Sequence, residues 1–427
     1  MFKPHALRIL LGLALVGAGC HATPTSTLPV LAAGSEAAAL GVHANEVLVK
    51  TLAGSRDAWL QPGWRVVRTL EPLGWKVVSV GTDSVMGAIA RLKQDGRVQA
   101  AEPQRLMHFK DAKPVAVRQG VTPTAAPDPA TNDPDLAKQL RYFDRIKLTE
   151  AWKATGQGAA TTIVAVLDTG VDASHPDLQG QLLPGYDFFN DKPEPKDDNS
   201  HGTACIGLLA AATNNHVGIA GVAPKIKVLP VKVLDRLGNG PLEICARGMV
   251  WSADHGAKII SFSSGEDAPS AVLQDAIDYC RKQDVMVLAA MGNDGENVQH
   301  WPACCPGVLA VGATYTEDDT PALFTTEGNW VGIAAPGDMI WTTRPTYPCP
   351  NPLDEEPLNY SLMAGTSASC PIVAGVAALV RTRFPQLTEG QVRARLQATA
   401  DDVGPKGVDD LTGAGRVNAL RALTAPL

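Results

Sequence analysis

Three polar residues that lie far apart in the sequence have the types and the order needed for nucleophilic catalysis: Asp168, His201 and Ser367. A serine hydroxyl becomes a good nucleophile only when a neighbouring base removes its proton. A histidine can be that base when a carboxylate fixes its tautomer and stabilises the imidazolium that forms. The chain order Asp, His, Ser is one of the known orders for such a triad. We therefore expect acyl transfer through Ser367.

Each of these residues also has an ordinary structural interpretation. An Asp that ends an apolar strand is commonly a turn residue or a cap, and a Ser at the start of a helix is commonly its N-cap. Ser200 and Thr203 are expected to cap the helix that begins at His201, and Pro371 is expected in the first turn of the helix that follows Ser367. The three candidate residues become informative together, because a catalytic site requires all of them in one place.

The elements that must position these residues are read from apolar patterns. Continuous apolar runs, unlike alternating ones, indicate strands that are buried on both faces. Such strands are expected at 163–167, 227–231, 258–262, 285–288 and 308–311, and helices at 201–212, 242–255, 271–283 and 372–379. Strands separated by helices predict an α/β fold, a three-layer sandwich around a mostly parallel sheet. Asp168 follows the first strand, and functional groups collect at the carboxyl ends of strands in such sheets.

The residues around the three positions resemble the signature blocks of a known family. Val166–Gly170, Ser200–Thr203 and Gly365–Ser367 are similar to the Asp, His and Ser blocks of the subtilisin-like serine proteases, and shorter phrases extend the similarity over about 133–420. The thermitase and proteinase K branch of the family is the most similar. This resemblance implies a subtilisin-like fold and a serine endopeptidase that hydrolyses peptide bonds through an acyl-enzyme on Ser367.

The resemblance also implies residues that stabilise charge and bind substrate. Asn293 stands where the family has the side chain that binds the oxyanion together with the backbone N–H of the nucleophile, and a plain turn Asn is the alternative. Two backbone edges of the family pair with an extended peptide. They correspond here to Gly238, Asn239 and Gly240, and to Ser263, Ser264 and Gly265. Ser264 replaces the usual Leu, so the specificity of the adjacent subsites is open.

Two cysteines flank the expected site. Cys205 resembles the buried thiol beneath the catalytic His in the thermitase and proteinase K branch, and Cys370 follows the nucleophile. A disulfide could join them, but two inert buried thiols are favoured. The chain has eight cysteines in all, and their connectivity stays open.

The resemblance further implies a structural calcium ion. In the thermitase-like branch an N-terminal Asp, an Asp after His-Pro and a loop Asn bind Ca²⁺, and Asp133, Asp177 and Asn215 stand at the corresponding positions. Oxygen ligands of this kind suit a hard cation. The alternatives are an N-terminal cap for Asp133 and a turn for Asn215.

The chain divides into five segments by composition. Residues 1–20 have the positive start and short apolar run of a signal peptide, too short to span a bilayer. The run ends in Gly17–Cys20, similar to the lipobox of bacterial lipoproteins, so we expect lipidation of Cys20, with ordinary signal cleavage as the alternative. Residues 21–44 are expected to be a flexible tether, 45–110 a small α+β ferredoxin-like domain, 111–132 a linker and 133–427 the peptidase domain.

The segment 45–110 resembles the inhibitory propeptide of the family. The resemblance implies a zymogen that cuts itself, with the final cut within 108–132, and a permanent accessory domain is the alternative. The propeptide would assist folding and then lie across the active site. Such help suits proteases whose native state is protected by slow unfolding.

The composition suits a large globular core, because 45% of the 427 residues are hydrophobic and 19% are charged. The net charge of −7 argues against a nucleic-acid partner. We expect an exported monomer, extracellular, periplasmic or lipid-anchored on a bacterial membrane, whose partners are polypeptide substrates and its own propeptide. The rival interpretations are a catalytically silent peptide-binding module of the same fold and a narrow processing protease.

Overall fold

The computed structural model describes residues 42–55, 57–109, 131–349 and 357–426. The predicted signal peptide, lipidation at Cys20, nearly all of the tether and most of the linker lie outside the described residues. Within the described ranges, no helix is both long and apolar enough to cross a membrane.

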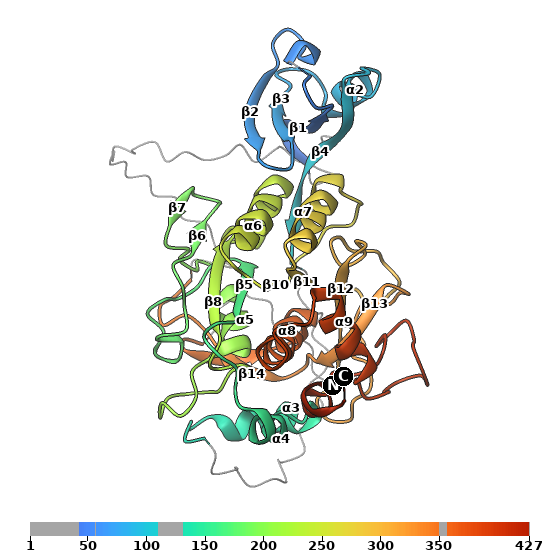
Figure 1. Cartoon of the computed structure of the whole chain (residues 1–427). Coiled ribbons are helices and arrows are strands. Elements are labelled where there is room, and N and C mark those ends of the chain that lie inside the picture. The colour runs from blue at the N-terminus through green and yellow to red at the C-terminus, as the bar shows by residue number, and fades with distance from the viewer. Residues whose placement is uncertain (1–41, 56, 110–130, 350–356, 427) are drawn as a thin grey trace, which may run out of the picture.

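A sheet of eight strands forms the centre of the larger body (Figure 1). Seven of its strands run in the same direction, and the short edge strand β7 pairs antiparallel with β6. Nearly all residues of the central strands are buried, as continuous apolar runs require. In spatial order the strands are β13 (Val331–Pro336), β12 (Val308–Thr314), β11 (Met286–Ala290), β10 (Ile259–Phe262), β5 (Ile163–Asp168), β8 (Lys227–Lys232), β6 (Tyr186–Asp187) and β7 (Lys192–Pro193).

Helices cover both faces of this sheet. On one face α5 (His201–Ala210) and α8 (Thr366–Arg383) share a core with the side chains of Val164, Val166 and Leu288. On the other face α6 (Leu242–Asp254) and α7 (Ala271–Lys282) share a second core with Ala165 and Leu167. The predicted α/β three-layer sandwich is therefore confirmed. The remaining helices are α3 (Leu136–Arg145), α4 (Leu148–Thr155), α9 (Glu389–Ala398) and α10 (Ala419–Thr424).

The N-terminal part of the described chain forms a small unit of its own. Its antiparallel strands lie in the order β2-β3-β1-β4, and β4 continues the sheet onto β9 (Asn239–Pro241) of the larger body. The expected strand–helix–strand repeat is present, but its first helix is only a 3₁₀ turn. The elements are β1 (Val42–Thr51), η1 (Asp57–Trp59), β2 (Arg65–Leu70), β3 (Trp75–Ser79), α2 (Val85–Leu92) and β4 (Val98–His108).

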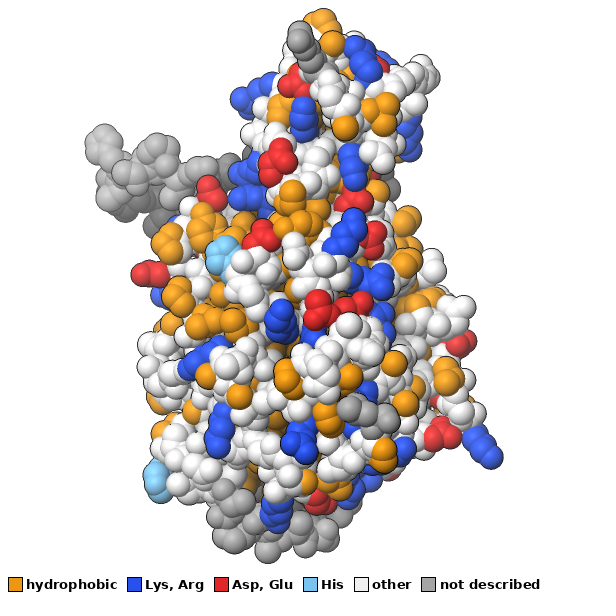
Figure 2. All heavy atoms as spheres, viewed as in Figure 1, with side chains coloured by type: hydrophobic (Ala, Val, Ile, Leu, Met, Phe, Trp, Pro, Cys, Tyr) orange, Lys and Arg blue, Asp and Glu red, His pale blue; other side chains and the backbone are white. Residues whose placement is uncertain are grey.

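The small unit uses the two faces of its sheet differently. Val47 and Val49 pack against α2 in a separate core, whereas the intervening Leu48 packs into the core that contains α6 and α7. This alternation follows from the period of two along a strand. Figure 2 shows the small unit as a projection from the larger body, with Lys, Arg, Asp and Glu side chains where the two meet.

Ion pairs and a helix cap join the small unit to the larger body. Lys50 Nζ lies 2.6 Å from Asp275 Oδ2 on α7, and Arg105 Nε lies 2.5 Å from Glu266 Oε2. The carboxylate of Glu102 accepts hydrogen bonds from the backbone N–H groups of Ala271 and Val272 at the start of α7. An acidic side chain is favourable there because the first N–H groups of a helix have no partner within the helix.

A hairpin near the C-terminal part was not predicted. Its strands are β14 (Ile340–Thr343) and β15 (Tyr360–Met363), which pair antiparallel. Thr342 and Thr343 donate hydrogen bonds to the carbonyl groups of Ala204 and Thr203, so this hairpin supports the helix that begins at His201.

Candidate active site

Asp168 and His201, two of the three predicted catalytic residues, lie at the ends of a strand and a helix that are neighbours in the fold. Asp168 is the last residue of β5 and His201 is the first residue of α5. His201 Nδ1 lies 2.8 Å and 2.9 Å from the two carboxylate oxygens of Asp168, and Asp168 is only 1% exposed. Because a carboxylate only accepts, Nδ1 carries the hydrogen and Nε2 is the nitrogen that can receive a proton.

The start of α5 is capped differently from the prediction. Ser200 is in the left-handed region at φ 106° and makes no side-chain cap. The carboxylate of buried Asp197 instead accepts hydrogen bonds from the N–H groups of Ser200 and Thr203 and from the Thr203 hydroxyl. Burial would raise the pKa of Asp197, but these hydrogen bonds lower it below its ordinary value.

The environment of His201 favours its protonated form. Burial opposes a charge on the imidazole, but the Asp168 carboxylate outweighs burial and raises the pKa of His201 well above its ordinary value. A base with a raised pKa is stronger once it is deprotonated. The geometry thus fits a histidine that takes a proton from a hydroxyl and holds it as an imidazolium.

Ser367 is the second residue of α8, and a proline one turn later leaves its carbonyl group without a helix donor. The expectation that Pro371 stands in the first turn of the helix is wrong, because α8 begins at Thr366 and Pro371 lies inside it. Pro371 has no N–H to donate to the carbonyl four residues earlier, which belongs to Ser367. That carbonyl accepts instead from Ser263 Oγ at 3.3 Å and Cys205 Sγ at 3.6 Å.

The Ser367 hydroxyl is held beside the same segment. Its Oγ donates to the Ser263 carbonyl oxygen at 3.3 Å. Within the described residues, no hydrogen bond joins Ser367 Oγ to His201. Catalytic hydrogen bonds are often long before substrate binds, and they tighten in the reacting complex.

Asn293 lies next to Ser367 in an orientation that fits an oxyanion donor. Its Oδ1 accepts hydrogen bonds from Thr366 N at 2.9 Å and from Thr366 Oγ1 at 3.0 Å. The carbonyl end of the amide is therefore fixed by Thr366, and the NH₂ group is the end that is oriented to donate to an oxyanion. A methyl group on Gly365 would come within 3.0 Å of Asn293 Nδ2, so glycine leaves space there.

The two predicted peptide-binding edges both hold a strand of this same chain. The end of β4 pairs with β9, with Met107 opposite Gly240 and His108 opposite Asn239. On its other side, His108 N donates to the Gly265 carbonyl at 2.9 Å, and Gly265 N donates to the His108 carbonyl at 2.8 Å. The chain's own segment thus lies in the groove as an extended peptide. Ser264 Oγ in the second edge is buried, and none of the described residues forms a hydrogen bond with it.

A buried histidine that the sequence did not suggest also borders the site. His300 lines a cavity of about 20 Å³ together with Ser367, Asn293 and the Ser263–Gly265 edge. Its Nδ1 lies 2.9 Å from Asp267 Oδ1, and its Nε2 contacts Asp294. The spacing of the sequence motifs does not predict a role for His300. The one feature of the sequence that could have suggested His300 is its position shortly after Asn293 in the same loop.

The cysteines near the site are thiols. All seven described cysteines are free, so no disulfide joins Cys205 to Cys370. Cys205 Sγ lies 3.8 Å from His201 Nδ1, beneath the imidazole as the resemblance implied. Burial raises the pKa of Cys370 to about 12, which keeps this thiol protonated and unreactive.

The predicted calcium ligands are brought together only in part. Fully buried Asp177 accepts hydrogen bonds from Asn215 Nδ2 at 2.8 Å, Ile219 N at 2.8 Å and the Tyr360 hydroxyl at 3.0 Å. Asp133 accepts from the backbone N–H of Asn215 at 3.3 Å. Asn215 thus links the carboxylates of Asp177 and Asp133, but it does so by donating hydrogen bonds to them. The three residues would suit a calcium ion if the Asn215 amide turned its oxygen toward Asp177.

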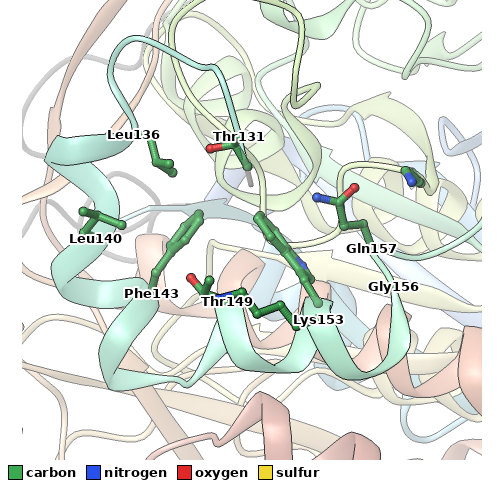
Figure 3. A pocket seen from close by; sticks show the side chains of 10 residues that line it. Thr131, Leu136, Leu140, Phe143, Thr149, Lys153, Gly156 and Gln157 are labelled. Atoms are coloured by element: carbon green, nitrogen blue, oxygen red, sulfur yellow. The ribbon is translucent and has the colours of Figure 1, made fainter. Parts of the chain in front are cut away.

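A second hollow lies away from these residues (Figure 3). It has a volume of about 260 Å³ and is bordered by α3 and α4, with Leu136, Leu140, Phe143 and Trp152 among its walls. None of the predicted catalytic, substrate-binding or metal-binding residues lines it, so the chemistry remains assigned to the groove that holds β4.

Comparisons with known proteins agree with this geometry. Residues 159–415 match the model of the subtilase family. Thermitase from Thermoactinomyces vulgaris is 38% identical over 293 residues, which cover 68% of this chain and 98% of thermitase. The thermophilic serine proteinase of Bacillus sp. (strain AK1) is 38% identical over 275 residues, 64% of each protein.

A solved structure extends the likeness to the small unit. Fervidolysin from Fervidobacterium pennivorans, described as a keratinolytic enzyme related to subtilisin, superposes with a TM-score of 0.77 at 27% identity. The superposition covers 90% of this chain and 61% of fervidolysin. It therefore reaches well beyond residues 159–415.

Proposed function

Since this chain belongs to the subtilase family and its named relatives are proteases, we propose that it is an exported serine endopeptidase with Asp168, His201 and Ser367 as its triad. The observation that carries the proposal is the buried Asp168–His201 pair beside a groove in which an extended strand lies next to Ser367. The alternative function is a peptide-binding module without catalytic activity. Such a module would not need a histidine whose pKa is raised.

The reaction follows from these positions. His201 Nε2 takes the proton of Ser367 Oγ as the oxygen bonds to the carbonyl carbon of the peptide. The NH₂ group of Asn293 and the backbone N–H of Ser367 bind the oxyanion that forms. His201 then gives its proton to the leaving nitrogen, the C–N bond breaks, and the acyl group stays on Ser367. Water, activated by His201, releases the acid by the same steps.

The small unit is proposed to be an inhibitory propeptide of a precursor that cuts itself. Its β4 lies in the groove, and Phe109 follows directly after the His108–Gly265 bridge. The chain direction therefore favours a cut on the C-terminal side of His108, within the expected range 108–132. We further propose an exported monomer, with lipid anchoring through Cys20, that acts on polypeptides.

The proposal is tested by labelling the purified, processed protein with a fluorophosphonate, which reacts with activated serines. We expect one label per chain, mapped to Ser367, together with hydrolysis of an unfolded polypeptide such as casein. The intact mass gives the position of the cut. A folded, processed protein that takes up no label would be the peptide-binding module instead.

Replacing Asn293 with Ala is expected to lower kcat by about 10²–10³-fold, because one oxyanion donor is lost. Substrate affinity should change much less, since the oxyanion exists only during the reaction. Steady-state kinetics with a peptide substrate measure both. The control is Asn297→Ala, the same exchange at an exposed residue of the same loop. Equal kcat values for the two variants would refute the oxyanion role.

Calcium is proposed to bind between Asp177 and Asn215, with Asp133 nearby. Burial raises the pKa of Asp177, and a cation would relieve the cost of its buried charge. Adding Ca²⁺ at a thousand times its Kd should stabilise the fold by about 4 kcal/mol, read as a higher Tm. The measurement uses Ser367→Ala protein, which cannot digest itself.

The calcium test compares Tm in Ca²⁺ with Tm in EDTA for the Ser367→Ala protein, which is the parent, and for two variants made in that parent. Asp177→Asn should lose the difference, whereas Asp402→Asn, at an exposed residue, should keep it. The same Tm in Ca²⁺ and EDTA for the parent protein would exclude a structural calcium ion.

A further inference from the structure

The buried side chain of His300 reaches the cavity beside Asn293 from a backbone that is held on both sides. His300 is 3% exposed. The next residue, Trp301, forms an antiparallel bridge with Glu266, with N–H to carbonyl hydrogen bonds of 2.9 Å in both directions. The carbonyl of His300 accepts a hydrogen bond from Cys304 N at 2.8 Å. The imidazole therefore projects from a fixed base.

The imidazole of His300 touches both chain neighbours of Asn293. Its Nε2 contacts the carboxylate of Asp294, the residue that follows Asn293. On the other side, a Cβ atom built on Gly292 would lie only 2.3 Å from Cδ2 of His300, so the ring packs against bare backbone. Gly292 has φ 108°, a conformation that favours glycine. One ring thus borders the segment immediately before and immediately after the candidate oxyanion donor.

The second nitrogen of His300 connects this segment to the opposite wall of the groove. Nδ1 lies 2.9 Å from Oδ1 of Asp267, which is two residues beyond Gly265 of the peptide-binding edge. An ionised carboxylate only accepts hydrogen bonds, so an imidazolium, with a hydrogen on each nitrogen, can donate to Asp267 and Asp294 at once. Hydrogen bonds between charged partners are about twice as strong as neutral ones. The ring therefore ties the edge to the loop that carries Asn293.

We propose that His300 is a positioning residue, which acts through Asp294 to hold the side-chain amide of Asn293 where the oxyanion forms. The inference rests on the proposed function, because it deepens the role proposed for Asn293. An oxyanion donor must already point at the developing charge, and a displacement of about 1 Å can cost about 10²-fold in rate. Thr326 Oγ1 gives the loop a second attachment, since it accepts from Asp294 N and donates to Asp294 Oδ2, both at 3.2 Å.

Replacing His300 with Gln tests this role. The Gln amide can donate to one carboxylate but cannot bridge two, so kcat should fall about 10²-fold. KM should stay close to the parent value, because the oxyanion exists only during the reaction. Steady-state kinetics with a peptide substrate measure both, on processed enzyme titrated with fluorophosphonate. The control is His255→Gln, the same exchange at an exposed histidine after α6, which should keep the parent kcat.

A double-mutant cycle separates positioning from a general structural role. In Asn293→Ala protein there is no amide left to position, so adding His300→Gln should change kcat by less than about twofold. A merely structural role would lower kcat by the same factor in both backgrounds. A 10²-fold loss that persists in the Asn293→Ala background would therefore overturn the inference.

Asp294→Ala tests the same connection without removing a buried side chain. The side chain of Asp294 is 24% exposed, so this variant should fold even if His300→Gln does not. It should reproduce the loss in kcat with little change in KM, and it should add nothing in the Asn293→Ala background. Glu296→Ala, at an exposed acid of the same loop, should keep the parent kcat. A parent-like kcat in Asp294→Ala would rule out positioning through this carboxylate.

The outcomes separate this inference from the proposed function. Unchanged kcat in His300→Gln, with normal labelling of Ser367, would overturn the positioning role and leave the protease intact. Absence of both labelling and hydrolysis in the parent protein would overturn the proposed function and the positioning role with it.

Discussion

Replacing Ser367 with Ala is expected to abolish peptide hydrolysis and to leave the precursor uncut. The variant lacks the atom that forms the acyl-enzyme, so the loss in kcat should be about 10⁶-fold, the size found when the serine of a subtilisin triad is removed. The fold should survive, because the helix-start backbone is unchanged and, among the described residues, Ser367 Oγ makes one hydrogen bond, to the Ser263 carbonyl. Intact mass after purification shows whether residues 42–109 remain attached.

The control for this change lies two residues further along the same helix. Ser369 is buried, and its hydroxyl donates to the carbonyl groups of Ala335 and Pro336 rather than facing the groove. Ser369→Ala should therefore still yield a processed enzyme. If purified Ser367→Ala protein is cut in the absence of any other protease, the precursor does not mature by its own active site.

Replacing Asp168 with Asn is expected to lower kcat by about 10⁴-fold while leaving the fold in place. Asp168 Oδ1 accepts a hydrogen bond from Thr169 N at 2.7 Å, so the amide oxygen of Asn should stay there. The amide NH₂ then replaces Oδ2 and points at His201 Nδ1. Nδ1 must become an acceptor, which places the hydrogen on Nε2 and removes the base.

The pH dependence gives this prediction a second measurement. Activity requires neutral His201, and Asp168 raises the pKa of His201, so the rate of the parent enzyme should rise as pH increases through that raised value. Asn carries no charge, so the midpoint for Asp168→Asn should move to lower pH. Asp402→Asn, at an exposed carboxylate, should leave rate and midpoint unchanged. An unchanged midpoint in Asp168→Asn would mean that Asp168 is not the partner of His201.

The fold and the candidate catalytic residues could be predicted from the sequence because their patterns are local. The five predicted strands appear within three residues of their expected ends, since continuous apolar runs report burial on both faces. The block around Asp168 combines such a strand with the acid at its end. The family resemblance drawn from these blocks is confirmed by the match to the subtilase model.

Other features depend on distant parts of the chain and could not be read locally. Nothing in Val98–His108 indicates that it pairs with Asn239–Pro241, because strand pairing is decided by tertiary packing. The place of Pro371 inside α8 was missed because proline normally ends a helix or opens one. Here the carbonyl it leaves without a helix partner is satisfied by Ser263 and Cys205, which come from other segments.

The pairing of β4 with β9 makes the small unit and the larger body share one continuous sheet, so the inhibitor that we propose would share a sheet with its enzyme. While both belong to one chain, the strand faces the groove at an effective concentration of the order of millimolar. A cut between the two parts of the chain would turn this contact into binding between two molecules. The fraction of bound groove would then depend on the concentration of the released fragment. If the small unit is the inhibitor that we propose, dilution would be the activator: the two fragments would stay silent where they are confined together and become active where they spread apart.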